Sequence, residues 1–169
     1  FFCFKLSNPP LLGFHIFVKF TNKIISSGPA KTIDYLELSI DNGAIISVDD
    51  LEELKKIQEI NKFTKVFLRI NDVIDNMTSR FGINISQINE CLRIIKNSKI
   101  EIIGFSFHIN NYNLDDRIYA IRKIIKLSEK YDIKIKYIDI GGGFPSNYCN
   151  KEDYERFLKQ VNSNMFFKH

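Results

Sequence analysis

Short runs of β-branched residues alternate with amphipathic segments along most of this chain, and this alternation most constrains its fold. A short apolar run is typical of a buried strand, whereas apolar residues three or four apart are typical of a helix. The sequence predicts strands at 23–27, 44–48, 66–70, 102–107 and 135–140. It predicts helices at 32–41, from Asp49 or Asp50 through Ile57, and at 86–95, 114–131 and 151–161.

Strands that alternate with helices form parallel sheets, because each parallel strand needs a crossover connection. The sequence therefore predicts an α/β fold, either an open doubly wound sheet or part of a (β/α)₈ barrel. Helix caps are expected at Thr32, at Asp49 or Asp50, and at Ser86. In both architectures, ligands bind at the carboxyl ends of the strands.

Composition narrows the class of protein. The chain has 169 residues, 44% hydrophobic and 26% charged, which is typical of one soluble domain. The net charge of +4 comes from scattered lysines, so nucleic acid is not an expected partner. No apolar run approaches the roughly 20 residues that cross a bilayer, so no membrane partner is expected.

The cysteines and the first residues favour a cytoplasmic setting. Cys3, Cys91 and Cys149 match no metal or disulfide spacing, and Cys91 falls on the apolar side of a predicted helix. A reducing compartment suits this pattern. The N-terminus has no basic leader and no starting Met, so we expect a fragment without a secretory signal.

The strand at 135–140 ends in three glycines, Gly141, Gly142 and Gly143, followed by Phe144-Pro145. Successive backbone N–H groups of such a turn can surround an anion, and glycine allows the required conformations. A phosphorylated ligand is one interpretation. A simple tight connection is the other, because glycine also occurs in turns that bind nothing.

Polar residues follow the other strands. His108 could stack on a flat ring, accept a proton or be an ordinary hydrogen-bonded residue; no neighbours at metal-ligand spacing suggest a metal. Arg69 lies in an apolar strand and could meet a ligand oxygen or pair with an internal carboxylate such as Asp72. Lys31 is expected to be a solvated lysine in the first turn of a helix.

Five motifs in one order resemble the alanine-racemase-like (fold type III) pyridoxal phosphate-dependent decarboxylases, which act on ornithine, arginine and diaminopimelate. The matching segments are Ser27–Thr32, Val48–Leu54, Leu68–Asn71 with Ser79–Gly82, Gly104–His108 and Ile138–Pro145. The resemblance implies a partial (β/α)₈ TIM-type barrel over residues 22–162, between a poorly matched segment 1–21 and a tail 163–169. It also implies that the family's C-terminal β-domain is missing.

The resemblance assigns roles to particular residues. Gly141, Gly142 and Gly143 would hold the phosphate of pyridoxal 5′-phosphate, His108 would stack on its ring, and Arg69 would lie near its phenolic oxygen. Asp139 would support the glycine loop. Lys5, in a segment similar to the family's Tyr-Ala-x-Lys-Ala motif, would be the Schiff-base lysine or an ordinary lysine at a displaced end.

The implied function is decarboxylation of a basic or diamino acid, such as ornithine, lysine or diaminopimelate, by a homodimer. Half of the family's site lies in segments without a counterpart here, so whether this chain is itself an enzyme stays open. One alternative is a non-catalytic remnant that binds pyridoxal phosphate or a partner protein. Another is a racemase-like relative on the same barrel.

Overall fold

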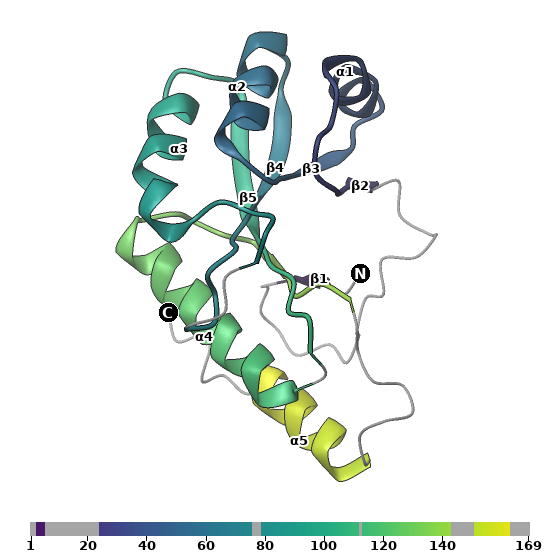
Figure 1. The fold of residues 1–169 in the computed structure, drawn as a ribbon, viewed down its shortest axis with the longest axis vertical. Coiled ribbons are helices and arrows are strands. Elements are labelled where there is room, and N and C mark those ends of the chain that lie inside the picture. Colours follow the sequence, from purple (N-terminus) through teal and green to yellow (C-terminus); the bar gives the residue numbers. More distant parts are fainter. Residues whose placement is uncertain (1–2, 6–23, 76–78, 112, 143–150, 163–169) are drawn as a thin grey trace.

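The computed structural model describes the backbone of residues 3–5 and residues 24–75, 79–111, 113–142 and 151–162. Its sheet has the order β1-β6-β5-β4-β3-β2, in which β2 to β6 are parallel and form a curled half-barrel (Figure 1). The predicted α/β fold is thus confirmed as the barrel type. The strands are β1 (Cys3–Lys5), β2 (Ile25–Ser26), β3 (Ile45–Val48), β4 (Thr64–Arg69), β5 (Ile100–Ser106) and β6 (Tyr137–Asp139).

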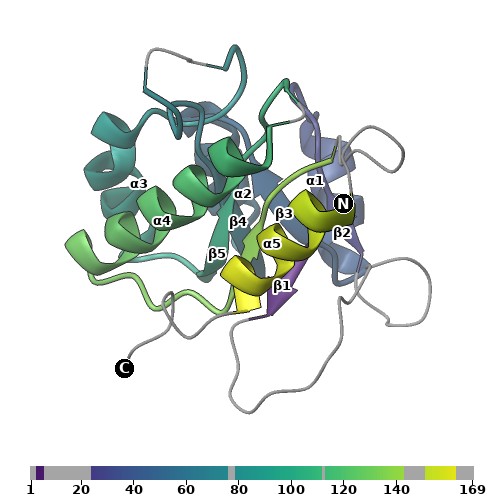
Figure 2. The same ribbon diagram turned by 90° about the horizontal axis from the view of Figure 1, so that it is seen from below.

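Helices follow the strands as the alternation predicts. Among the described residues these are α1 (Ile33–Asp41), α2 (Leu51–Ile60), α3 (Ile88–Ile95), α4 (Leu114–Lys130) and α5 (Lys151–Asn162), with a short 3₁₀ turn η1 (Ile85–Gln87). Helix α5 packs beside α4 (Figure 2). No helix in the described ranges is long and apolar enough to span a membrane.

Local capping explains where these helices begin. The hydroxyl of Thr32 accepts a hydrogen bond from Tyr35 N at 3.3 Å, and Asp50 accepts one from Glu53 N at 2.8 Å, as predicted. The prediction for Ser86 is wrong. Asn84 caps this turn instead, because its side chain accepts from Ser86 N and the side chain of Gln87 accepts from Asn84 N.

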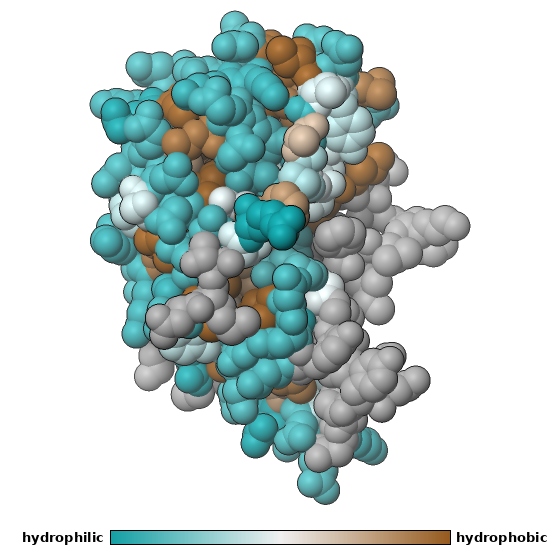
Figure 3. Space-filling view, in the orientation of Figure 1, coloured by the Kyte–Doolittle hydropathy of each residue, from teal (hydrophilic) through white to brown (hydrophobic). Residues whose placement is uncertain are grey.

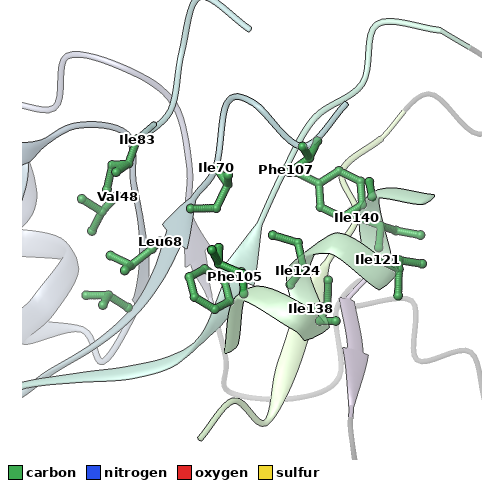
Figure 4. Packing of buried hydrophobic residues seen from close by; sticks show 14 of the residues in the cluster. Val48, Leu68, Ile70, Ile83, Phe105, Phe107, Ile121, Ile124, Ile138 and Ile140 are labelled. Atoms are coloured by element: carbon green, nitrogen blue, oxygen red, sulfur yellow. The ribbon is translucent and has the colours of Figure 1, made fainter. Parts of the chain in front are cut away.

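The main core lies between the outer face of the sheet and the helices. Alternate residues of each strand face this layer, because successive side chains of a strand point to opposite faces. Figure 4 shows Ile124 of α4 packed with Phe105 and Ile138 of the sheet. Cys91 is fully buried in the same cluster, as the sequence predicts, and burial raises the pKa of its thiol to about 12.

The other face of the strands is the interior of the half-barrel. Its lower layer is apolar, with Ile45, Phe67 and Ile103 packed together. Above it, towards the carboxyl ends, the side chains become polar, and the hydroxyls of Ser47 and Ser106 are 2.9 Å apart. Interior polarity therefore rises towards the edge where barrel proteins bind ligands.

Gly104 allows β4, β5 and β6 to approach one another in this interior. A Cβ there would lie 2.0 Å from Tyr137 O and 2.8 Å from the ring of Phe67. The register of β4 and β5 shifts beside it, between Val66 and Phe67. The glycine within this strand thus marks a bulge and a close backbone contact.

One element was not predicted. Strand β1 pairs antiparallel with β6, with Cys3 opposite Asp139 and Lys5 opposite Tyr137. It therefore lies at the β6 end of the sheet, whereas β2 forms the opposite edge.

Hydrophilic side chains cover most of the face seen in Figure 3, where apolar side chains appear only as small areas.

Candidate functional site

The carboxyl ends of the parallel strands bring the predicted polar residues to one edge. Arg69 at the end of β4 is in register with Ser106 of β5, and Ser106 is in register with Asp139 of β6. Asp49 directly follows β3, and His108 lies two residues after β5. Residues from four separate motifs therefore meet at this edge.

Gly141 lies directly against His108. A Cβ on Gly141 would stand 3.0 Å from His108 Nδ1 and 2.7 Å from Phe107 O, and the backbone φ of +74° favours glycine. A Cβ on Gly142 would meet nothing within 4 Å. The first two glycines thus form a turn without side chains beside an imidazole. This arrangement fits a planar ring that carries a phosphate. Gly143 lies outside the described residues.

Asp139 anchors this turn. Its Oδ1 accepts a hydrogen bond from Gly141 N at 2.9 Å, and its carbonyl accepts one from Phe107 N at 3.0 Å. The carboxyl group is buried, and burial raises its pKa despite the hydrogen bond from Gly141. The contact agrees with the supporting role expected from the resemblance.

His108 is exposed, with its imidazole at the open edge. Partial burial lowers its pKa below 6.5, and the nearby charges of Arg69 and Arg117 lower it further. These effects favour the neutral form of the ring, which presents a flat face. Within the described ranges, no group of three or more His, Cys, Asp or Glu side chains is placed to hold a metal.

Arg69 is paired, but with a different carboxylate from the one suggested by sequence. Its Nη1 donates to Asp49 Oδ1 at 2.7 Å. Asp72 instead accepts a hydrogen bond from Ile85 N at 3.1 Å. The partner comes from the neighbouring strand end because parallel strands align Asp49 and Arg69 at one edge.

The expected exposure of Lys31 is wrong. Its side chain is only 3% exposed, and its Nζ donates to Gly28 O at 2.6 Å, Ser47 O at 2.8 Å and Glu53 Oε1 at 2.8 Å. A buried ammonium requires such partners, because desolvation of an unpaired charge is costly. Lys31 therefore supports the carboxyl ends of the strands from a buried position.

Sequence reasoning also missed Arg117 of α4, which is fully buried. Its guanidinium donates to Asn111 O at 2.8 Å, Asn113 O at 3.3 Å and Gly142 O at 3.1 Å. It thus ties the loop after β5 to the glycine turn after β6. The sequence does indicate this burial, because Arg117 shares a helix face with the apolar residues Leu114, Ile118 and Ile121.

The position of Lys5 differs from that of the other predicted site residues. In the antiparallel pairing, Lys5 lies opposite Tyr137, at the start of β6, whereas His108 and Gly141 lie beyond the other ends of their strands. The structure describes only the backbone here. Its assignment as the Schiff-base lysine stays a prediction.

A small cavity of about 70 Å³ opens beside His108. Its polar lining includes Asn71, Ser79 and Asn110. The Nδ2 of Asn71 donates to Gly82 O at 2.9 Å, whereas its buried Oδ1 has no hydrogen-bond partner among the described residues. The cavity could accept a hydrogen-bond donor.

Comparison with known families shows the family of the chain. The model of the pyridoxal-dependent decarboxylase family, pyridoxal binding domain, matches residues 13–167. The chain belongs to this family. The sequence resemblance implies pyridoxal 5′-phosphate as the cofactor. The family is pyridoxal-dependent, which agrees with this implication. The match begins after Lys5.

Individual relatives agree with this membership. The chain is 25% identical over 150 residues to a probable ornithine decarboxylase of Dictyostelium discoideum, covering 83% of this chain and 32% of the relative. It is 27% identical over 152 residues to antizyme inhibitor 2 of Mus musculus, covering 84% and 33%. The chain therefore spans about a third of the length of these curated relatives.

A solved structure shows the same fold. The arginine decarboxylase of Paramecium bursaria Chlorella virus superposes with a TM-score of 0.70 at 28% identity. The superposition covers 85% of this chain and 42% of the viral enzyme. The half-barrel of this chain therefore corresponds to part of the larger viral enzyme.

Proposed function

We propose that this chain forms the pyridoxal phosphate-binding part of a decarboxylase that acts on a basic or diamino acid. The observation that carries the proposal is the contact between Gly141 and His108 at the strand edge that also holds Arg69. A turn without side chains, a flat imidazole and a fixed cation together suit a phosphorylated aromatic ring.

Each residue has a distinct role in this proposal. The turn from Gly141 to Gly143 would bind the phosphate through backbone amides other than that of Gly141, which donates to Asp139. His108 would cover one face of the ring, and Arg69 would face its anionic oxygen. Lys5 would be the covalent attachment point. The cofactor, when bound, supplies an electron sink for the carbanion left when the α-carboxylate departs.

The protein's own contribution is binding and orientation. Asp139 and Arg117 hold the glycine turn from two sides, through Gly141 N and Gly142 O. A turn held in this way loses little additional entropy when it binds an anion. The lowered pKa of His108 favours an uncharged imidazole, so Arg69 would supply the positive charge that faces the anionic oxygen.

The substrate class rests on the relatives. The similar proteins described above include an ornithine decarboxylase and an arginine decarboxylase, and both of these substrates are basic amino acids. We extend this class to the present chain as part of the proposal. The homodimer implied by the sequence resemblance is likewise proposed, and sedimentation equilibrium of the purified chain tests it.

Equilibrium dialysis with pyridoxal 5′-phosphate and with unphosphorylated pyridoxal tests cofactor binding. We expect saturable binding of the phosphorylated form, and weaker binding in Gly141→Val because the new side chain would meet Phe107 O and His108. Equal binding of both compounds would contradict the phosphate cradle. Release of CO₂ from carboxyl-labelled ornithine, lysine or arginine tests the reaction itself.

A non-catalytic binding protein is the second candidate. The register of β1 favours it, because the backbone of Lys5 lies towards the start of β6 rather than at the His108 edge. One similar protein is named as an inhibitor rather than an enzyme. Cofactor binding that persists in Lys5→Ala, without CO₂ release from any basic amino acid, would favour this candidate. Decarboxylation by the unsubstituted chain would eliminate it.

A further inference from the structure

Three segments whose residues have no role in the proposed function converge on Arg69. They contain Lys31, the pair Asp49 and Glu53, and Phe81. These residues come from separate strand-end segments, yet each contacts Arg69 directly or through one intermediate residue.

Asp49 holds the guanidinium from within the barrel. Its Oδ1 accepts from Arg69 Nη1 at 2.7 Å, and its Oδ2 lies 3.8 Å from Lys31 Nζ. The side chain of Asp49 is only 3% exposed, whereas that of Arg69 is 14% exposed. The carboxylate is thus buried between two cations and fixes the more exposed one.

Lys31 and Glu53 fix Asp49 in turn. Glu53 Oε1 accepts from Lys31 Nζ, and its Oε2 accepts from Asp49 N at 2.8 Å. Lys31 uses its three donors on Gly28, Ser47 and Glu53, so it cannot turn towards the open edge without losing them. The two cations and two carboxylates balance in charge.

Phe81 contacts the guanidinium from another direction. The Cζ of Arg69 lies 5.8 Å from the centroid of the Phe81 ring, within the range of a cation–π interaction. The segment is attached to the end of β4, because Ile83 N donates to Arg69 O at 2.6 Å. The ring therefore reaches Arg69 from a loop hydrogen-bonded to the same strand.

We propose that Asp49 and Phe81 are positioning residues that hold the guanidinium of Arg69 in one orientation at the strand edge. Asp49 accepts one of the five N–H donors, and no other side chain in the described ranges accepts from the rest. The identity of the ligand rests on the proposed function: the remaining N–H donors of Arg69 bind the anionic oxygen of the pyridoxal ring. Lys31 and Glu53 support this arrangement through Asp49.

Side-chain NMR of Arg69 tests the positioning without any cofactor. The order parameter of its Nε–H group is compared between the unsubstituted chain and two variants, Asp49→Asn and Phe81→Leu. We expect a decrease from about 0.8 to below about 0.6 in both, because each loses one restraint. Matched controls are Asp50→Asn, whose Asn still caps α2, and Phe63→Leu at an exposed ring beside Lys65.

A second measurement connects positioning to the ligand. We expect pyridoxal 5′-phosphate to bind about tenfold more weakly to both variants, as when one charge-assisted hydrogen bond is misdirected. Circular dichroism checks folding. Phe81 is 41% exposed, so its variant keeps the test valid even if Asp49→Asn does not fold.

The outcomes separate the two proposals. If the order parameter falls but the unsubstituted chain does not bind pyridoxal 5′-phosphate, the positioning holds and the proposed function fails. If Arg69 stays equally ordered in Phe81→Leu and in any folded Asp49→Asn, the positioning is overturned whatever the cofactor does. A decrease of the same size in the matched controls would also overturn it.

Discussion

The backbone of Gly141 packs against the imidazole of His108, so closely that a Cβ on Gly141 would lie 3.0 Å from His108 Nδ1. We expect Gly141→Ala to lower the free energy of unfolding by about 2 kcal/mol or more, through left-handed strain and overlap with Phe107 O. Urea denaturation measures this loss. Gly142→Ala is the control for stability, because its Cβ enters open space, and equal losses in both variants would contradict the packing.

The Lys31–Glu53 pair predicts a second stability effect. We expect Lys31→Met to destabilise the fold by about 3–5 kcal/mol, because it leaves a buried carboxylate without its partner. The double variant Lys31→Met/Glu53→Gln should recover part of the loss in thermal or urea unfolding. Lys55→Met, which removes an exposed pair with Glu52, should leave stability nearly unchanged. Similar effects of Lys31→Met and Lys55→Met would show that Lys31 is not buried.

The pKa of His108 should depend on Arg69. We expect titration of the imidazole below 6.5, and a rise of this pKa in Arg69→Gln, because a nearby positive charge disfavours the protonated ring. Proton NMR of the imidazole C–H groups follows the titration, with His108→Gln to assign the signal. Arg93→Gln, at an exposed arginine paired with Glu90, should leave the value unchanged. A lower pKa in Arg69→Gln would contradict the prediction.

Asp139 predicts a particular dependence of stability on pH. Burial raises its pKa in the folded state, whereas the unfolded carboxyl titrates near 3.8. As pH rises from 3.8 through the folded-state pKa, the unfolded state loses this proton first, so the free energy of unfolding decreases. Asp139→Asn should remove this part of the slope in urea unfolding measured upward from pH 3.8. A steeper decline in the variant would contradict the sign.

Local and strand-end patterns predicted much of this molecule. The alternation gave the parallel strands, and the rule for carboxyl ends grouped Asp49, Arg69, His108 and Gly141 before any coordinates. These features can be predicted from sequence because the spacing of apolar side chains and the residue preferences of turns depend on neighbouring residues. Strand bounds were less accurate; β4, for example, begins at Thr64 rather than Val66.

The missed features depend on residues far apart in sequence. Lys31 is buried because Glu53, 22 positions later, meets it in the fold. Arg69 pairs across to the end of β3 rather than with Asp72, three positions along its own chain. Strand β1 lacks the run of β-branched residues that predicts the other strands, and its pairing with β6 joins segments more than 130 positions apart.

The antiparallel attachment of β1 has a consequence for assembly. It satisfies the row of backbone N–H and C=O groups on the outer side of β6, the same row that a further parallel strand would need in order to continue the curl towards a closed cylinder. Retention of the first residues at this edge and extension of the sheet past β6 are therefore mutually exclusive. The N-terminal segment competes with barrel closure.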